Sequence, residues 1–206
     1  MSNYKLTYFD FDGGRAEPIR IAMHAAGISF EDVRWSFPEF AEKRESVRFN
    51  AVPSIEIDGK TITQSNAISR YIGKMAGLYP EDATQALYCD EVVGALEDLN
   101  HYVVQTFGLQ GDDLKQAREK LVSGRLPVFL KGLDELLTRG GGRYFANQSL
   151  SIADLKTVQQ IKHIQAGSLE HIPADLVDKL TPALAEHRKN IEKEPQVVAY
   201  YESLQR

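Results

Sequence analysis

The segment 52–68, VPSIEIDGKTITQSNAI, constrains the fold more than any other part of the chain. Ile55 and Ile57 alternate with polar residues, and Asp58-Gly59 is a residue pair suited to the two positive φ angles of a type I′ turn. A two-residue loop at this point places Ile55 opposite Ile62. The segment therefore predicts a β-hairpin with one buried face.

Both ends of the hairpin carry further signals. Pro53 lies directly before the first strand, where its missing N–H interrupts no ladder, and a tight cis X-Pro turn fits this position. After the second strand, Ser65 precedes apolar residues at helical spacing, so we expect it at the N-cap or in the first turn of a helix. A helix N-terminus beside a sheet edge can bind an anion. The same pattern is also typical of an ordinary ββα unit in which Ser65 only caps its own helix.

The residues before the hairpin complete a mixed α/β unit. The pattern predicts a strand from Lys5 to Phe9, a helix from Arg15 to Ala26, a strand from Phe30 to Trp35 and a weak helix or loop from Phe37 to Phe49. The order βαβαββα is the thioredoxin-like arrangement, in which the proline before the third strand faces the end of the first strand. The redox thiol of thioredoxins is absent, because the chain has one cysteine, Cys89.

The second half of the chain has only helical periodicity. Pro80 interrupts the pattern, so we expect a thioredoxin-like domain at residues 1–78, a linker at 79–83 and an all-α domain at 84–206. Apolar residues run from Leu87 to Phe107 and from Leu121 to Leu137, which predicts two long helices followed by shorter ones.

The sequence LSIADL marks the start of one of the shorter helices. Ser151 is the expected N-cap and Asp154 its acidic partner three residues later, which is a capping box. Leu150 and Leu155 occupy the two positions of a hydrophobic staple.

Composition excludes several classes of function. A single cysteine excludes disulfides, CxxC pairs and thiolate zinc sites within the chain, and the five histidines lack metal-site spacing, so we predict no metal. A net charge of −5 without a basic block argues against a nucleic-acid partner. No signal peptide and no apolar run long enough for a membrane span are recognisable, which favours a cytoplasmic protein without a membrane partner.

The opening YKLTYFDFDGGRAEPIR, with Val-Pro before the hairpin and Gln-Ser before the helix, resembles the tyrosine-type cytosolic glutathione transferases, most of all the sigma class. The capping box is similar to the folding box of that family, so the resemblance covers the chain from Tyr4 to Leu204. It implies an enzyme that conjugates glutathione to small hydrophobic electrophiles. It also implies a cytoplasmic homodimer that uses glutathione as co-substrate and needs no other cofactor.

The resemblance implies two catalytic residues. Tyr8 would donate a hydrogen bond to the glutathione thiolate, and Arg15 would add a positive charge. Lowering a thiol pKa from about 8.5 by about 2 units requires roughly 2.7 kcal/mol, which one charge-assisted hydrogen bond and one screened charge can supply. From the residues alone, the commoner interpretation of Tyr8 is a half-buried strand tyrosine, and the alternative for Arg15 is a solvated first-turn arginine.

The resemblance also implies a glutathione-binding set. The main chain of Val52, before a cis Pro53, would pair with the cysteine of glutathione, and the Gln-Ser pair would receive the γ-glutamyl carboxylate. An acidic residue of the first long helix, Asp98 or its rival Glu97, would reach the glutathione amine in the neighbouring subunit. The full set is Tyr8, Phe40, Arg44, Val52, Pro53, Gln64, Ser65 and Asp98.

Three positions depart from the family pattern. The loop Phe11-Asp12-Gly13-Gly14 is longer or differently composed, which affects the placement of Tyr8 and Arg15. Phe40 replaces a tryptophan and so lacks its N–H donor, although Arg44 stands near the usual lysine and could clamp a carboxylate. Ala51 removes another polar contact, so we expect modest affinity for glutathione.

The electrophile is expected in an apolar pocket between the domains, although aromatic residues at helical spacing are more often part of a core. Two other functions stay open: a non-catalytic, crystallin-like relative that binds glutathione or another ligand, and a sigma-type prostaglandin isomerase. The candidate pocket walls are Phe9, Phe11, Gly14, Tyr102 and Phe107.

Overall fold

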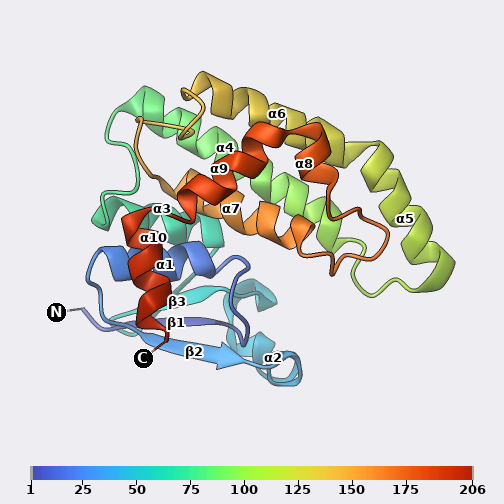
Figure 1. Cartoon of the computed structure of the whole chain (residues 1–206). Helices are drawn as coiled ribbons and strands as arrows, with labels where there is room; N and C mark the ends of the chain where they lie inside the picture. The colour runs from blue at the N-terminus through green and yellow to red at the C-terminus, as the bar shows by residue number, and fades with distance from the viewer. Residues whose placement is uncertain (1, 206) are drawn as a thin grey trace. The chain divides into compact units, whose positions relative to one another are not determined.

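A computed structural model describes residues 2–205 and divides by its contacts into two units (Figure 1). One unit takes the chain up to Tyr79 together with the segment from Gln196, and the other runs from Pro80 to Pro195. The sequence placed the last segment in the second domain, whereas its contacts group it with the first.

The first unit contains the predicted thioredoxin-like fold. Its four strands are β1 (Tyr4–Phe9), β2 (Glu31–Trp35), β3 (Ser54–Ile57) and β4 (Lys60–Thr63), in the order β2-β1-β3-β4. β1 pairs with β2 in parallel and with β3 antiparallel, and β3 and β4 form the hairpin.

The helices of this unit are α1 (Glu17–Ala25), α2 (Phe37–Lys43), α3 (Ser65–Met75) and α10 (Pro195–Ser203), and α1 packs against α3. Two 3-10 turns, η1 (Arg44–Ser46) and η2 (Arg48–Asn50), follow α2. α10 lies beside α1 (Figure 1). The ring centroid of Tyr200 on α10 lies 5.8 Å from that of His24 on α1.

The hairpin is confirmed in register and turn. Ile55 pairs with Ile62, and Asp58 and Gly59 have φ angles of 49° and 80°. The expected buried face is only half present, since Ile55 is 1% exposed and Ile62 is 37% exposed. The reason is topological, because β4 is an edge strand and Ile62 has no neighbouring strand beyond it.

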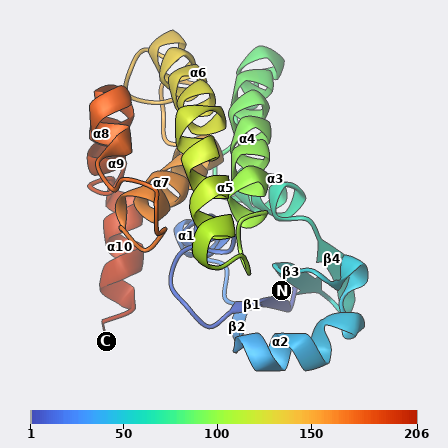
Figure 2. The ribbon, with the colours of Figure 1, turned by 90° about the vertical axis from the view of Figure 1, so that its right-hand side faces the viewer.

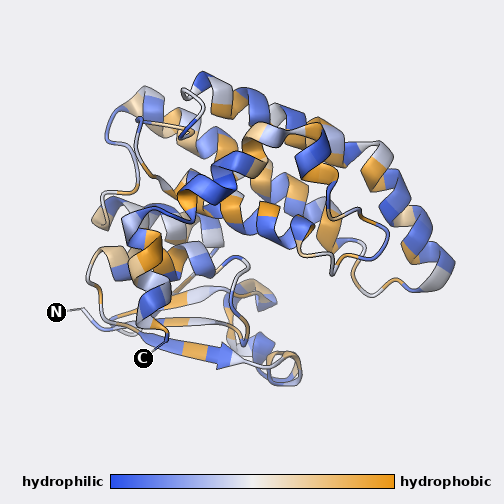
Figure 3. Cartoon of the chain, in the orientation of Figure 1, coloured by the Kyte–Doolittle hydropathy of each residue, from blue (hydrophilic) through white to orange (hydrophobic). Residues whose placement is uncertain are grey.

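The second unit is all helical among its described residues. Its helices are α4 (Ala83–Val104), α5 (Gly111–Ser123), α6 (Arg125–Arg139), α7 (Ile152–Gln165), α8 (Leu176–Leu180) and α9 (Pro182–Ile191). α6 packs against α4 and α5 (Figure 2), and α7 packs against α4, α8 and α9. Figure 3 shows α5 as mostly hydrophilic, which agrees with its two buried residues, Arg118 and Leu121.

The predicted second long helix is wrong, because the structure divides this region into α5 and α6 at Gly124. A Cβ at Gly124 would lie 2.9 Å from the carbonyl oxygen of Lys120, so the break requires glycine.

The predicted capping box at the start of α7 is present. Asp154 is 0% exposed, and its Oδ2 accepts hydrogen bonds from the N–H and the Oγ of Ser151, at 2.9 and 2.6 Å. Its Oδ1 accepts from the N–H of Phe145 and lies 2.9 Å from Nε2 of His187. Asp154 therefore joins three segments of the second unit as well as capping one helix.

Candidate functional site

Three strands of the first unit bring predicted site residues to one end of the sheet. Thr7 pairs with Ser54 in the antiparallel ladder, so the next step of the register sets Pro53 opposite Tyr8. β4 ends beside Ser54 and continues into Gln64. The end of β1, the start of β3 and the start of α3 thus lie at the same sheet end.

The backbone at this end has two special conformations. The Val52–Pro53 peptide bond is cis, as the resemblance implied. Gln64 has φ 75° and is the N-cap of α3, so Ser65 is the first helical residue rather than the cap. Ser65 is buried, 7% exposed, and Gln64 is exposed. The N-terminal turn of α3 is suited to a carboxylate, because its N–H groups carry the positive end of the helix dipole.

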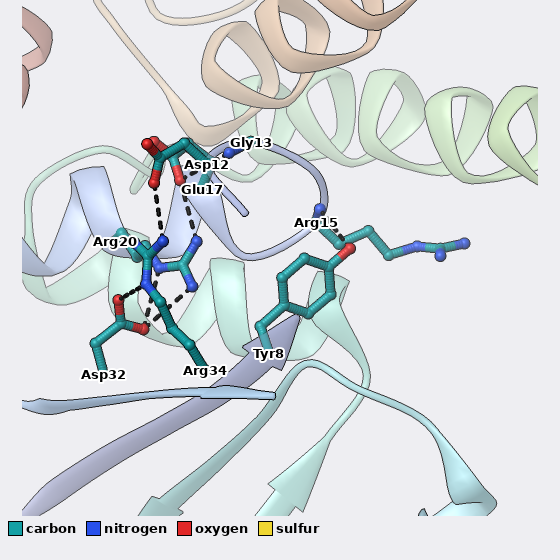
Figure 4. A network of polar contacts seen from close by, with 8 residues as sticks. All are labelled: Tyr8, Asp12, Gly13, Arg15, Glu17, Arg20, Asp32 and Arg34. Atoms are coloured by element: carbon teal, nitrogen blue, oxygen red, sulfur yellow. Dashed lines mark hydrogen bonds and ion pairs between the residues drawn. The ribbon is translucent and has the colours of Figure 1, made fainter. Parts of the chain in front are cut away.

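Tyr8 is 5% exposed, and its phenol oxygen accepts a hydrogen bond of 3.2 Å from the main-chain N–H of Arg15. Figure 4 shows the Arg15 side chain extending away from the phenol. Gly14 makes this approach feasible, since a Cβ there would lie 2.8 Å from the phenol oxygen. The structure thus places the main-chain N–H of Arg15 against the phenol of Tyr8, whereas the sequence analysis assigned a role to the Arg15 guanidinium.

An aromatic cluster surrounds this site. The Phe9 ring lies 5.1 Å from Tyr8, 5.0 Å from Phe40 and 4.9 Å from Phe37, and it stacks on Phe11 at 6.1 Å. Phe11 is also edge-on to Tyr8 at 5.6 Å and is 39% exposed. Phe9, Phe11 and Gly14 are thus brought together with Tyr8, while Phe40 serves as a packing residue of the cluster.

The remaining predicted residues lie elsewhere. Arg44 is exposed and begins η1, directly after α2. On α4 of the second unit, Asp98 is exposed and Glu97 half-buried. Tyr102 packs on Phe129 at 5.8 Å, in the same unit. Phe107, which follows α4, is 51% exposed and lies edge-on to His163.

A network of charges behind Tyr8 was missed by the sequence analysis (Figure 4). Glu17 and Arg20 of α1 form a buried ion pair of 3.2 Å, with side chains 0% and 1% exposed. Asp32 of β2 joins Arg20 to Arg34, and Arg34 also binds Asp12 at 2.9 Å. One signal was available: two charged residues three apart among the apolar residues of α1 fit a buried pair better than a solvated face.

Thiol and metal chemistry by the protein's own side chains finds no support in residues 2–205. This part of the chain has no cluster of histidine, cysteine and carboxylate side chains suited to a metal ion. Cys89 is fully buried, and burial raises the pKa of its thiol to about 12.

Two family models match the chain. The model for the N-terminal domain of glutathione S-transferase matches residues 4–74, and the model for the C-terminal domain matches residues 97–204. The chain belongs to the glutathione S-transferase family. The family match agrees with the thioredoxin-like unit and the helical unit, and it supports the fold class inferred from the sequence.

Individual relatives span nearly the whole chain. The hematopoietic prostaglandin D synthase of Gallus gallus is 31% identical, over 97% of this chain and 96% of the relative. The solved structure of a prostaglandin synthase D of Nilaparvata lugens has a TM-score of 0.85 at 28% identity, covering 97% of both chains. A sigma class glutathione transferase of Fasciola hepatica has a TM-score of 0.83 at 25% identity, covering 98% of this chain and 96% of the other.

A further solved structure is a transferase of Necator americanus whose description calls it monomeric. It has a TM-score of 0.77 at 25% identity and covers 98% of this chain and 97% of the other. No helix within residues 2–205 of this family member is long and apolar enough to cross a membrane.

Proposed function

We propose that this transferase binds glutathione at the sheet end of its first unit and activates the thiol with Tyr8. The observation that carries the proposal is the hydrogen bond from the Arg15 N–H to the Tyr8 oxygen. A phenol oxygen that accepts from an N–H keeps its own O–H as a donor, and the accepted bond polarises that O–H. Donated to sulfur, the O–H favours the thiolate over the thiol and lowers the pKa of bound glutathione.

The magnitude is sufficient without a charge from Arg15. A hydrogen bond to a charged group contributes about 1.5–3 kcal/mol, and a pKa shift of about 2 units needs roughly 2.7 kcal/mol. In a substitution, the thiol proton passes to solvent, the thiolate forms a C–S bond with the electrophile, and the leaving group departs with the electron pair of its bond. With an isothiocyanate the thiolate adds to the central carbon, and the nitrogen takes the electron pair of the C=N π bond together with a proton from solvent. The ring cluster of Phe9 and Phe11 offers an apolar surface beside Tyr8 for that electrophile.

The remaining contacts of glutathione follow from the sheet end. The main chain of Val52 before the cis Pro53 is proposed to pair with the cysteine of glutathione, and Gln64 with the first turn of α3 to receive the γ-glutamyl carboxylate. Arg44 is exposed beyond α2 and available to the glycine carboxylate. Asp98 is proposed to reach the ammonium group of glutathione in the site of the second subunit of a homodimer. Glutathione is the only co-substrate proposed, and the location is proposed to be the cytoplasm.

A second candidate function is isomerisation of a prostaglandin endoperoxide. Two similar proteins, from Gallus gallus and Nilaparvata lugens, are named prostaglandin synthases, and the same thiolate would serve without being consumed. A carrier without turnover is the third candidate.

One set of assays separates these functions. The purified protein is loaded on immobilised glutathione, and turnover is measured with chlorodinitrobenzene, with an isothiocyanate and with a prostaglandin endoperoxide. Conjugation supports the transferase, endoperoxide turnover with unchanged glutathione supports the isomerase, and retention without turnover supports the carrier. A protein that is neither retained nor active would refute all three.

A further inference from the structure

The loop between β1 and α1 has little means of holding its own conformation. Gly13 and Gly14 have φ angles of 107° and 64°, which residues other than glycine rarely adopt. Two glycines in sequence also leave the unfolded loop with high conformational freedom. This loop nevertheless has to present the Arg15 N–H to Tyr8 at hydrogen-bond distance.

Polar contacts from outside hold residues 12–15 of the loop. Asp12 is bound by Arg34 of β2 at 2.9 Å, and the Arg15 N–H is bound by Tyr8. Between them, the Gly13 N–H donates to Oε2 of Glu17 at 3.1 Å. Asp12 is 67% exposed, so its ion pair is screened by water, whereas Glu17 is fully buried. Of these two attachments to a charged side chain, the contact of Glu17 is therefore the one less screened by water.

Glu17 is itself held in place by buried partners. Arg20 binds Oε2 of Glu17 at 3.2 Å and is anchored on Asp32 of β2 through Nε, at 3.1 Å (Figure 4). Tyr200 of α10 lies near the same carboxylate: burial raises the pKa of its phenol, and the charge of Glu17 raises that pKa further. Burying such a pair costs desolvation energy and stabilises a fold poorly, so a geometric role explains the pair better than stability does.

We propose that Glu17 is a positioning residue that fixes the Gly13–Arg15 loop and thereby the hydrogen bond from the Arg15 N–H to Tyr8. The inference rests on the proposed thiolate chemistry. Glu17 touches no reacting atom in this scheme and acts through the loop and Tyr8. Its removal lets the Arg15 N–H withdraw, so the Tyr8 O–H becomes a weaker donor and the bound thiol a weaker acid.

The test compares Glu17→Ala, which removes the acceptor for the Gly13 N–H, with Glu17→Gln, which keeps an acceptor oxygen but loses the charge. The readout is the pKa of bound glutathione, followed by the ultraviolet absorbance of the thiolate. We expect Glu17→Ala to raise that pKa by about 1 unit, and Glu17→Gln to raise it less. For a thiol pKa that moves from about 6.5 to about 7.5, this rise means about threefold less thiolate at pH 7. Equal pKa values for wild type and Glu17→Ala would overturn the inference.

Loss of stability is separated from loss of positioning by two further variants. Asp154→Ala, in the second unit, should lower Tm without moving the thiol pKa. If Glu17→Ala does not fold because the buried Arg20 loses one of its two carboxylate partners, the double variant Glu17→Leu with Arg20→Met removes both buried charges and the same acceptor. It should show the same rise in thiol pKa, and an unchanged value would overturn the inference.

A measurement on the wild-type protein is independent of any variant. Hydrogen exchange of the Gly13 and Arg15 amides, resolved by NMR, should be slow for a glycine loop because both N–H groups are bonded. Exchange at the rate of an open loop would overturn the inference. If the wild-type protein does not lower the thiol pKa of bound glutathione, the proposed function itself is refuted. If the wild type lowers that pKa and Glu17→Ala lowers it equally, only the role of Glu17 is refuted.

Discussion

The main-chain N–H of Arg15 donates a hydrogen bond to the phenol oxygen of Tyr8 over 3.2 Å, while the Arg15 side chain extends away from that phenol (Figure 4). The backbone and the side chain of Arg15 are therefore separate sources of any effect on the thiol. A substitution at residue 15 retains the N–H, whereas a change in the loop can remove it with the guanidinium intact.

Tyr8→Phe should lower turnover by about one to two orders of magnitude and leave the fold intact, because one hydrogen bond to the charged sulfur is lost. The phenylalanine ring preserves the contacts of Tyr8 with Phe9 and Phe11. The pKa of bound glutathione should rise in step with the loss of rate, and Tm should change little. An unchanged thiol pKa in the variant would show that Tyr8 does not stabilise the thiolate and that another group is the donor.

Asp154→Ala should destabilise the protein by about 3 kcal/mol, since a buried carboxylate is removed and its donors are left unpaired. The donors are the N–H and Oγ of Ser151, the N–H of Phe145 and the ring of His187. Chemical denaturation measures the difference. Glu39→Ala is the matched control, because Glu39 forms the same capping box with Ser36 on the surface and should cost far less.

Local features of the sequence predicted most of the first unit and the start of α7. Asp58-Gly59 defined the hairpin turn, and Ser151 with Asp154 defined a helix start, because both signals act between residues close in sequence. The thioredoxin-like order followed from the same local patterns. The exposure of Ile62 was not predictable in this way, because it depends on β4 being the edge strand.

Long-range pairing explains what the sequence left out of the site. Arg20 of α1 and Asp32 of β2 meet only in the folded chain, and spacing along the sequence does not show that. The resemblance identified Arg15 as a charge, whereas the structure shows its main chain bonded to Tyr8. Side-chain identity carries no information about which backbone group reaches a neighbour.

Cys89 should resist alkylation in the native protein. Its side chain is 0% exposed and burial raises its pKa to about 12, so at neutral pH almost no thiolate is present and access is blocked. Mass spectrometry after treatment with iodoacetamide should show no adduct without denaturant and one adduct with it. Stoichiometric labelling of the native protein would show that α4 opens around residue 89.

Asp98→Asn should weaken glutathione binding about three- to tenfold while the oligomer keeps its mass, because a partly screened contact to the ligand ammonium is lost. Calorimetry measures the affinity for glutathione, and light scattering measures the mass of the oligomer. Glu97→Gln, at the adjacent half-buried acid of α4, is the comparison. If only Glu97→Gln weakens glutathione binding, Glu97 and not Asp98 contacts the ammonium group. If the wild-type protein is a monomer with normal affinity for glutathione, a site shared between subunits is refuted.

Gly14→Ala should reduce turnover about as strongly as Tyr8→Phe, because the new methyl group occupies the space of the phenol oxygen. A Cβ at Gly14 would lie 2.8 Å from that oxygen and 3.1 Å from Cε1 of the same ring. Since φ is +64° at Gly14, part of any effect is backbone strain and has to be subtracted.

Gly27→Ala is the control that measures the effect of backbone strain alone. Gly27 has the same φ of +64°, and a Cβ there has no heavy atom within 4 Å. Alanine is strained in the left-handed region, so both variants should lose about 1 kcal/mol of free energy of unfolding from this strain, and Tm should fall in both. Only Gly14→Ala should raise the thiol pKa of bound glutathione and slow conjugation. Equal activity of the two variants would mean that the phenol tolerates displacement, and the close approach of Gly14 to Tyr8 would then have no part in activating the thiol.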